Sequence, residues 1–150
     1  MQVKAVFFDS GHTLMRPIGD RWFPGMQFLQ LCSAHGVVVV DNQALEDACD
    51  LDYAYLAAHP DDMPDVAAEE RQFSDYYRIL FERLRIDAPQ ALIADLAISE
   101  VTDVNFEPYP ATRRVLDSIK AMGLPMALFD RRAAFSTLQI PQNRLLRLLR

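Results

Sequence analysis

The chain contains two short, mainly apolar segments, one near its start at residues 3–8 and one at residues 125–129. The first is rich in β-branched and aromatic residues, contains no Gly or Pro, and is too short for a typical helix. It therefore predicts a buried strand of a parallel sheet. The second segment predicts another core strand, which brings the chain back to the same sheet.

Between these segments the apolar residues recur at helical spacing, which predicts several helices in succession. Residues that favour helix ends support their bounds, with Asp65 as an N-cap, Pro89 in a first turn and Gly123 as a stop. The predicted helices span residues 21–34, 42–58, 65–84, 87–101 and 109–123.

The apolar faces of three of these helices define a predicted core. Its residues are Trp22, Met26, Leu29 and Cys32, then Phe73, Tyr76, Tyr77, Leu80, Phe81 and Leu84, and finally Val115, Leu116 and Ile119. Residues 37–40 are all valine and form either a short strand or an extended connector, because periodicity cannot distinguish these in so short a run.

The order of strand, loop, helices and strand predicts an α/β fold, with a parallel-sheet core and an inserted helical lobe. We assign residues 1–15 and 106–150 to the core and residues 16–105 to the inserted lobe. The length of 150 residues suits one such unit.

Composition narrows the classes of function and location. The chain is 51% hydrophobic and 24% charged, with a formal net charge of -6, which disfavours nucleic acid or an anionic membrane as the main partner. A small-molecule substrate is the expectation. No segment resembles a cleavable signal or a membrane span, so we expect a cytoplasmic protein. Cys32 and Cys49 lack the spacing of a zinc site and are expected to be reduced core residues.

The candidate chemistry lies directly after the first strand, where Asp9-Ser10-Gly11 form a turn at the carboxyl end of that strand. Asp9, Thr13 and Leu14 match the motif Asp-x-x-Gly-Thr-Leu, and residues 109–124 are similar to the Pro-led, Gly-ended helix before a second motif. In these features the chain resembles the haloacid-dehalogenase (HAD)-like hydrolase superfamily. The resemblance covers roughly residues 3–129 and implies a Rossmann-like core with a helical cap.

The resemblance also implies a reaction and a cofactor. Asp9 would be the catalytic nucleophile, whose carboxylate forms an aspartyl phosphate or ester that water later hydrolyses. In a phosphatase the carboxylate of Asp9 and the backbone carbonyl of Gly11 would bind Mg²⁺, while the backbone N–H groups of Ser10 and Gly11 would bind phosphate. The implied substrate is a small phosphorylated metabolite.

Two positions in this first motif and one position at the second motif depart from the family pattern. Gly11 stands where the phosphatase branch has a second Asp, the general acid and base. His12 follows it and is either a substitute acid/base or an exposed loop side chain. Phe129-Asp130 stand where the second motif has Ser or Thr, often followed by Asn, so no phosphate-binding role is assigned to Phe129.

The fourth departure concerns the end of the chain. The later Lys and acidic motifs of the family are missing, which implies an incomplete Rossmann-like core. No acidic residue follows Asp130, so residues 131–150 carry a charge of +5 and residues 1–130 a charge of -11. This change of composition where the resemblance ends suggests an altered reading frame, a fusion junction or a degenerated gene. Alternatively, the basic tail forms a surface helix or is disordered.

These observations leave three functional hypotheses. The leading one is a Mg²⁺-dependent phosphatase. The second is a haloacid dehalogenase, since a halide leaves without a proton and needs no second Asp. The third is a non-catalytic, truncated relative. An exposed sheet edge would favour self-association, so a homodimer is a further expectation.

Other residues receive weaker assignments. His35 and His59 are expected to be solvated at helix ends. Five aromatic residues of the helical lobe either line a substrate pocket or pack between helices; they are Trp22, Phe23, Phe28, Tyr53 and Tyr55.

Overall fold

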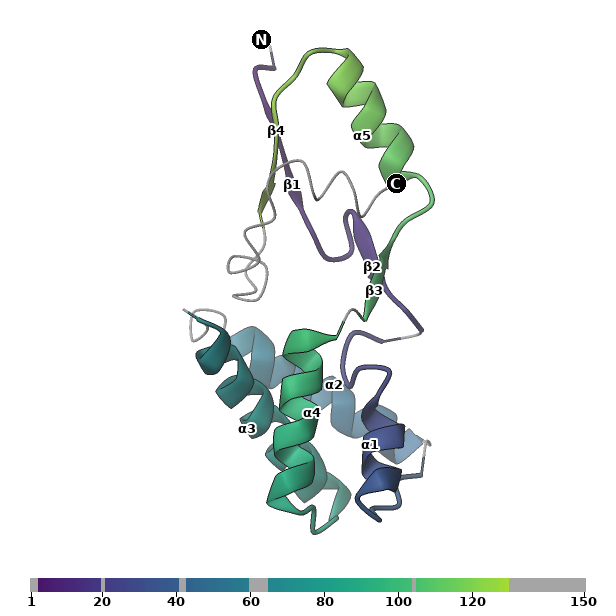
Figure 1. Cartoon of the computed structure of the whole chain (residues 1–150), viewed down its shortest axis with the longest axis vertical. Helices are drawn as coiled ribbons and strands as arrows, with labels where there is room; N and C mark the ends of the chain where they lie inside the picture. The colour runs from purple at the N-terminus through teal and green to yellow at the C-terminus, as the bar shows by residue number, and fades with distance from the viewer. Residues whose placement is uncertain (1–2, 20, 41–42, 60–64, 104, 130–150) are drawn as a thin grey trace.

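Helices and short strands make up the fold, as Figure 1 shows for a computed structural model that describes residues 3–19, 21–40, 43–59, 65–103 and 105–129. The helices are α1 (Phe28–Ala34), α2 (Gln43–Ala58), α3 (Val66–Leu84), α4 (Gln90–Thr102) and α5 (Thr112–Ala121). The strands are β1 (Val6–Asp9), β2 (Met15–Pro17), β3 (Phe106–Pro108) and β4 (Met126–Phe129). The fold is therefore mixed α/β.

The strands predicted at the two ends of the described chain are confirmed and pair with each other. β1 and β4 run parallel, with Val6 opposite Met126 and Asp9 opposite Phe129. The prediction that this first strand is buried is wrong, because the side chain of Phe7 is 75% exposed. A parallel strand is buried when layers cover both faces of its sheet, whereas the described residues form a sheet of β1 and β4 alone. A full Rossmann-like sheet is not formed by this part of the chain.

A second, antiparallel pair of strands was not predicted. Met15 of β2 lies opposite Pro108 of β3, and the Ile18 N–H extends the pairing by donating to the Asn105 carbonyl at 2.9 Å. Each strand has three residues and includes a proline, so neither carries a recognisable alternation of apolar and polar positions. The pair joins the segments that lead into and out of the helices α1–α4.

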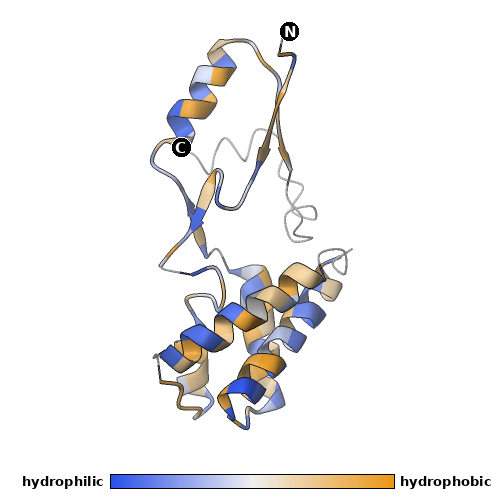
Figure 2. Ribbon diagram, turned by 180° about the vertical axis from the view of Figure 1, so that it is seen from behind, coloured by the Kyte–Doolittle hydropathy of each residue, from blue (hydrophilic) through white to orange (hydrophobic). Residues whose placement is uncertain are grey.

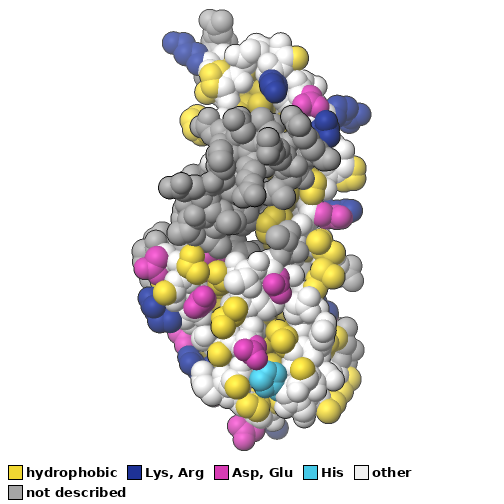
Figure 3. Space-filling view, in the orientation of Figure 1, with side chains coloured by type: hydrophobic (Ala, Val, Ile, Leu, Met, Phe, Trp, Pro, Cys, Tyr) yellow, Lys and Arg dark blue, Asp and Glu magenta, His cyan; other side chains and the backbone are white. Residues whose placement is uncertain are grey.

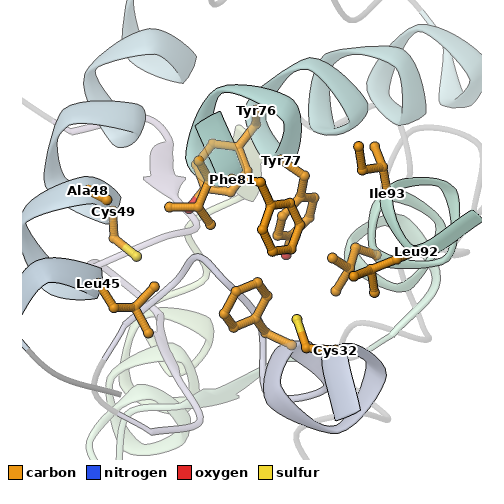
Figure 4. Close-up of a cluster of buried hydrophobic side chains, with 12 residues drawn as sticks. Cys32, Leu45, Ala48, Cys49, Tyr76, Tyr77, Phe81, Leu92 and Ile93 are labelled. Carbon is orange, nitrogen blue, oxygen red and sulfur yellow. The ribbon is translucent and has the colours of Figure 1, made fainter. Parts of the chain in front are cut away.

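Helices α1–α4, here called the four-helix unit, pack around a common core (Figure 1). Hydrophobic and hydrophilic residues alternate along these helices (Figure 2), and their buried apolar side chains converge in Figure 4. Helix α3 supplies aromatic side chains that are almost completely buried. The core contains Phe28, Cys32, Leu45, Ala48, Cys49, Tyr76, Tyr77, Leu80, Phe81, Leu92, Ile93 and Leu96. The predicted apolar face of α3 is confirmed for Phe73, Tyr76, Tyr77, Leu80 and Phe81.

Helix ends agree with the sequence in part. Asp65 is the N-cap of α3, as predicted, and its Oδ1 accepts a hydrogen bond from the Ala68 N–H at 2.8 Å. Gly123 follows α5 in the left-handed region, with φ +70°. Asn42 and Pro60, the predicted ends of the second helix, lie outside the described residues.

Several predictions about helical segments were wrong or are now resolved. Met26 and Leu29, which were assigned to an apolar helix face, are 59% and 42% exposed. α1 begins at Phe28 and not at residue 21, because the preceding segment contains Pro24 and Gly25, which interrupt a helix. Residues 37–40 belong to no strand and connect α1 to the segment before α2. Val115 of α5 is 42% exposed instead of facing inward, while Leu116 is buried as expected.

The two cysteines behave as predicted. Cys32 and Cys49 are both buried in the core of the four-helix unit and are not joined in a disulfide. Burial raises the pKa of the Cys32 thiol to about 11, which keeps it protonated and unreactive near neutral pH.

The two histidines of the helical segments differ. His35 was expected to be solvated, but its Nε2 lies 2.8 Å from Asp95 Oδ2, so it links the end of α1 to α4. His59 is exposed, and its ring packs against that of Tyr55. Phe28 packs in the core, which supports the packing interpretation of that aromatic residue.

Charged side chains of both signs are visible on one face of the described part. On the face in Figure 3, acidic and basic side chains are dispersed over the four-helix unit. Among the described helices, none is both long and apolar enough to cross a membrane. The division into a core of residues 1–15 and 106–150 and a lobe of residues 16–105 stays a prediction.

Candidate functional site

Asp9 is the last residue of β1, at the carboxyl end of the parallel strand pair. Its side chain is exposed, and its Oδ2 accepts a hydrogen bond from the Thr13 hydroxyl at 3.3 Å. Across the ladder its partner is Phe129, the last residue of β4. An exposed carboxylate oriented by a neighbouring hydroxyl is a suitable nucleophile.

The loop of residues 9–15, here called the Asp9 loop, is stabilised by its own backbone hydrogen bonds. The Ser10 carbonyl accepts from the N–H groups of Leu14 and Met15 at 2.9 and 3.0 Å, and the His12 N–H donates to the Met15 carbonyl at 2.9 Å. His12 lies in the left-handed region with φ 58°, which few residue types other than glycine adopt readily. The loop is thus a tight turn with an exposed imidazole on it.

The end of the Asp9 loop is fixed by residues that are distant in the sequence. The Leu14 side chain is buried, and its carbonyl accepts from the Tyr109 N–H at 3.0 Å and from the buried Thr112 hydroxyl at 2.7 Å. The Thr112 contact spans 98 positions. Sequence reasoning missed Thr112, since a Thr in the first turn of a helix is common for purely local reasons.

Trp22 lies against the other part of the Asp9 loop. Its Cζ2 is 3.6 Å from the position that a Cβ on Gly11 would occupy, and its ring meets the His12 ring edge-on at a centroid distance of 5.3 Å. Its ring also lies 6.4 Å from that of Phe106 in β3. The Asp9 loop, the segment before α1 and the distant strand β3 therefore meet at this indole.

A buried polar cluster lies where the chain enters and leaves the four-helix unit. Glu100 of α4 accepts hydrogen bonds from the Gly25 N–H at 2.6 Å and from the Tyr77 hydroxyl. Burial, followed by the neighbouring Glu100 carboxylate, raises the pKa of Tyr77 well above its usual range, so its hydroxyl stays protonated as a donor. Asn105 is also buried beside Gly25. The cluster ties the segment before α1 to the end of α4.

Gly25 cannot accept a side chain in this cluster without movement of its neighbours. A Cβ there would lie 2.6 Å from Asn105 Nδ2 and 3.0 Å from both carboxylate oxygens of Glu100. We expect Gly25→Ala to lower the free energy of unfolding by about 1–3 kcal/mol, as overpacking of a buried site does. Urea denaturation followed by circular dichroism measures this loss.

Gly11→Ala is the matched control for that variant. Its Cβ would meet the Trp22 ring at 3.6 Å, an ordinary van der Waals distance, so stability should stay within about 1 kcal/mol of the original value. Equal losses in the two variants would contradict the close packing inferred at Gly25.

The candidate residues Asp9, Ser10, Gly11 and His12 follow one another in the same loop, as expected from their sequence. The internal hydrogen bonds of this loop use the carbonyls of Ser10 and Met15, so they leave the Gly11 carbonyl to other ligands. Within the described ranges, no group of three or more His, Cys, Asp or Glu side chains is placed to hold a metal ion. A carboxylate and a carbonyl nevertheless suit Mg²⁺, which usually keeps several water ligands.

No protein-family model matches the chain, and no curated protein matches it significantly. The resemblance to HAD-like hydrolases therefore rests on the motif residues themselves. Residues 130–150, which include the basic tail, lie outside the described residues.

Proposed function

We propose that the chain is a HAD-like hydrolase of the phosphatase type, with the Asp9 loop as its reactive site and the four-helix unit as its cap. The observation that carries this proposal is the position of Asp9, an exposed carboxylate at the carboxyl end of a parallel strand, hydrogen-bonded to Thr13 of the same motif. In sheets with parallel strands, ligands generally bind at this end. The helices inserted between β2 and β3 support the finer assignment of a capped core.

In the first step, a carboxylate oxygen of Asp9 attacks the phosphorus of a phosphate monoester. The new bond joins this oxygen to phosphorus, while the ester P–O bond breaks and its electron pair leaves with the alcohol oxygen. Thr13 orients the carboxylate through its hydrogen bond to Oδ2. The backbone N–H groups of Ser10 and Gly11 are the proposed donors to the phosphate oxygens.

In the second step, water attacks the aspartyl phosphate, which releases inorganic phosphate and restores the carboxylate of Asp9. Both steps benefit from a group that transfers protons, and Gly11 has none. His12 is the candidate substitute, because its imidazole is exposed on the same loop. A weak proton donor matters less for an aryl phosphate, whose phenolate leaves readily, than for an alkyl phosphate.

Asp9 through its carboxylate and Gly11 through its carbonyl would hold Mg²⁺. The cation, when bound, supplies positive charge that offsets the repulsion between the carboxylate and the phosphate. Asp9 then has two tasks, as ligand and as nucleophile.

Hydrolysis of an aryl phosphate by the purified chain tests the proposal. We expect turnover with Mg²⁺ and its loss in excess chelator, restored when Mg²⁺ is added back. Phenolate release, followed by absorbance, measures the rate.

A second assay with a haloacid substrate completes this test, and two outcomes would contradict the phosphatase proposal. Halide release from a short 2-haloacid that continues in chelator would favour the dehalogenase, for which the absence of a carboxylate at Gly11 is no disadvantage. The absence of turnover with either substrate would favour a non-catalytic relative.

A further inference from the structure

We propose that Trp22 is a positioning residue that holds the Gly11–His12 part of the Asp9 loop in its conformation. The inference rests on the proposed function only in treating this loop as the reactive site. Trp22 is the single tryptophan of the chain and precedes α1, in the segment that leads from β2 to the four-helix unit.

Trp22 contacts the part of the Asp9 loop that has an unfavourable backbone conformation and little side-chain packing of its own. His12 has a backbone conformation that is unfavourable for a residue with a side chain, and the indole packs against its ring at 5.3 Å. Gly11 has no side chain with which to pack, and the indole lies 3.6 Å from where one would begin. Trp22 thus fills the space beside both residues.

Trp22 acts through packing and not through a hydrogen bond. Its Nε1 is buried and has no hydrogen-bond partner within the described ranges. On its other side the ring meets Phe106 of β3. Removal of the indole therefore costs the loop its contact surface without removing a polar interaction that the described residues show.

The segment that carries Trp22 is itself fixed. Three residues further along the chain, the Gly25 N–H donates to the buried Glu100 carboxylate at 2.6 Å, and the Tyr77 hydroxyl donates to the same carboxylate. A rigid contact within three residues restricts where the indole can lie. The four-helix unit is in this way connected to the Asp9 loop.

The loop has a second anchor, which provides a comparison. Leu14 is held from the α5 side by Tyr109 and Thr112, whereas Trp22 contacts Gly11 and His12. If the anchors act separately, loss of the indole should loosen the middle of the loop even when the Thr112 bond remains.

Amide hydrogen exchange, measured by mass spectrometry on a peptide that covers residues 9–16, tests this inference without requiring activity. We expect Trp22→Ala to speed exchange of this peptide by about tenfold or more, because the hydrogen bonds of His12, Leu14 and Met15 open more often. Phe28→Ala removes a ring from the core of the four-helix unit and serves as the control for general destabilisation.

Trp22→Leu keeps the test informative if the alanine variant does not fold, because leucine retains apolar volume but cannot reach both His12 and Phe106. Trp22→Phe should restore most of the protection. Unchanged exchange in the leucine or alanine variant, or equal changes in Phe28→Ala, would overturn the inference. A loss of protection in Thr112→Val that is absent from Trp22→Ala would also overturn it.

Activity separates this inference from the proposed function. A chain that hydrolyses no phosphate ester but shows the expected exchange pattern disproves the phosphatase and retains the positioning role. An active chain should lose about tenfold in kcat in Trp22→Ala, with recovery in Trp22→Phe.

Discussion

Asp9→Asn should reduce the hydrolysis of an aryl phosphate by about 10³-fold or more, because an amide oxygen does not displace the alcohol from phosphorus. The replacement has the same shape, and the Thr13 hydroxyl can donate to the amide oxygen as it does to Asp9 Oδ2. The side chain is exposed, so the fold should be preserved. Steady-state rates and circular dichroism of the variant measure both effects.

Asp117→Asn is the matched control, since it removes another exposed carboxylate, one that lies 3.8 Å from Arg113 within α5. We expect this variant to keep its activity. Asp9→Ala gives an independent variant that cannot revert to Asp by deamidation. Equal rates in the original chain and in both Asp9 variants would show that the activity does not come from the Asp9 loop.

The parts of the fold that could be predicted are those with a local signal. Asp65 as a cap follows from the preference of Asp for helix N-termini, the aromatic face of α3 follows from helical spacing, and both are present. The strands at residues 6–9 and 126–129 follow from short apolar runs, and their parallel pairing follows from the helices between them. In each case the neighbouring sequence determines the local structure.

The parts that could not be predicted depend on contacts between distant segments. The β2–β3 pair is too short to show alternation, and the exposure of Phe7 depends on which layers cover the sheet. The prediction of a helix from residue 21 followed the apolar spacing at Trp22, yet Trp22 instead packs on the Asp9 loop. A helical apolar position and a tertiary contact are indistinguishable in a single sequence.

In the candidate site, too, the local features could be predicted and the contacts between distant segments could not. Asp9, Ser10, Gly11 and His12 are contiguous, so the motif alone places them together. The contacts that support them come from elsewhere in the chain, and no local motif marks Thr112 as one of them. Glu100 lies at helical spacing from Ile93 and Leu96 on the buried face of α4, but the sequence does not show that it accepts two hydrogen bonds there.

Gly11→Asp should increase the rate of alkyl phosphate hydrolysis by about 10²–10⁴-fold, the usual contribution of a positioned acid and base. The structure allows this substitution, because Gly11 lies outside the left-handed region and its Cβ would meet the Trp22 ring at 3.6 Å. The carboxylate then has to turn away from the indole. The gain should be smaller for an aryl phosphate, whose leaving group needs less protonation.

Gly11→Asn separates the effect of proton transfer from that of side-chain shape. Its amide has the size of the carboxylate but neither accepts nor releases a proton near neutral pH. A gain in the aspartate variant that is absent from the asparagine variant would mean that the loop lacks only this group. If the two variants have equal rates, the carboxylate is not transferring a proton and Asp9 is not acting with a partner at position 11. The ratio of alkyl to aryl rates in the original chain provides the baseline, since a site without a proton donor should favour the aryl substrate strongly. His12 would have to account for any alkyl phosphate activity that remains, which His12→Gln can remove.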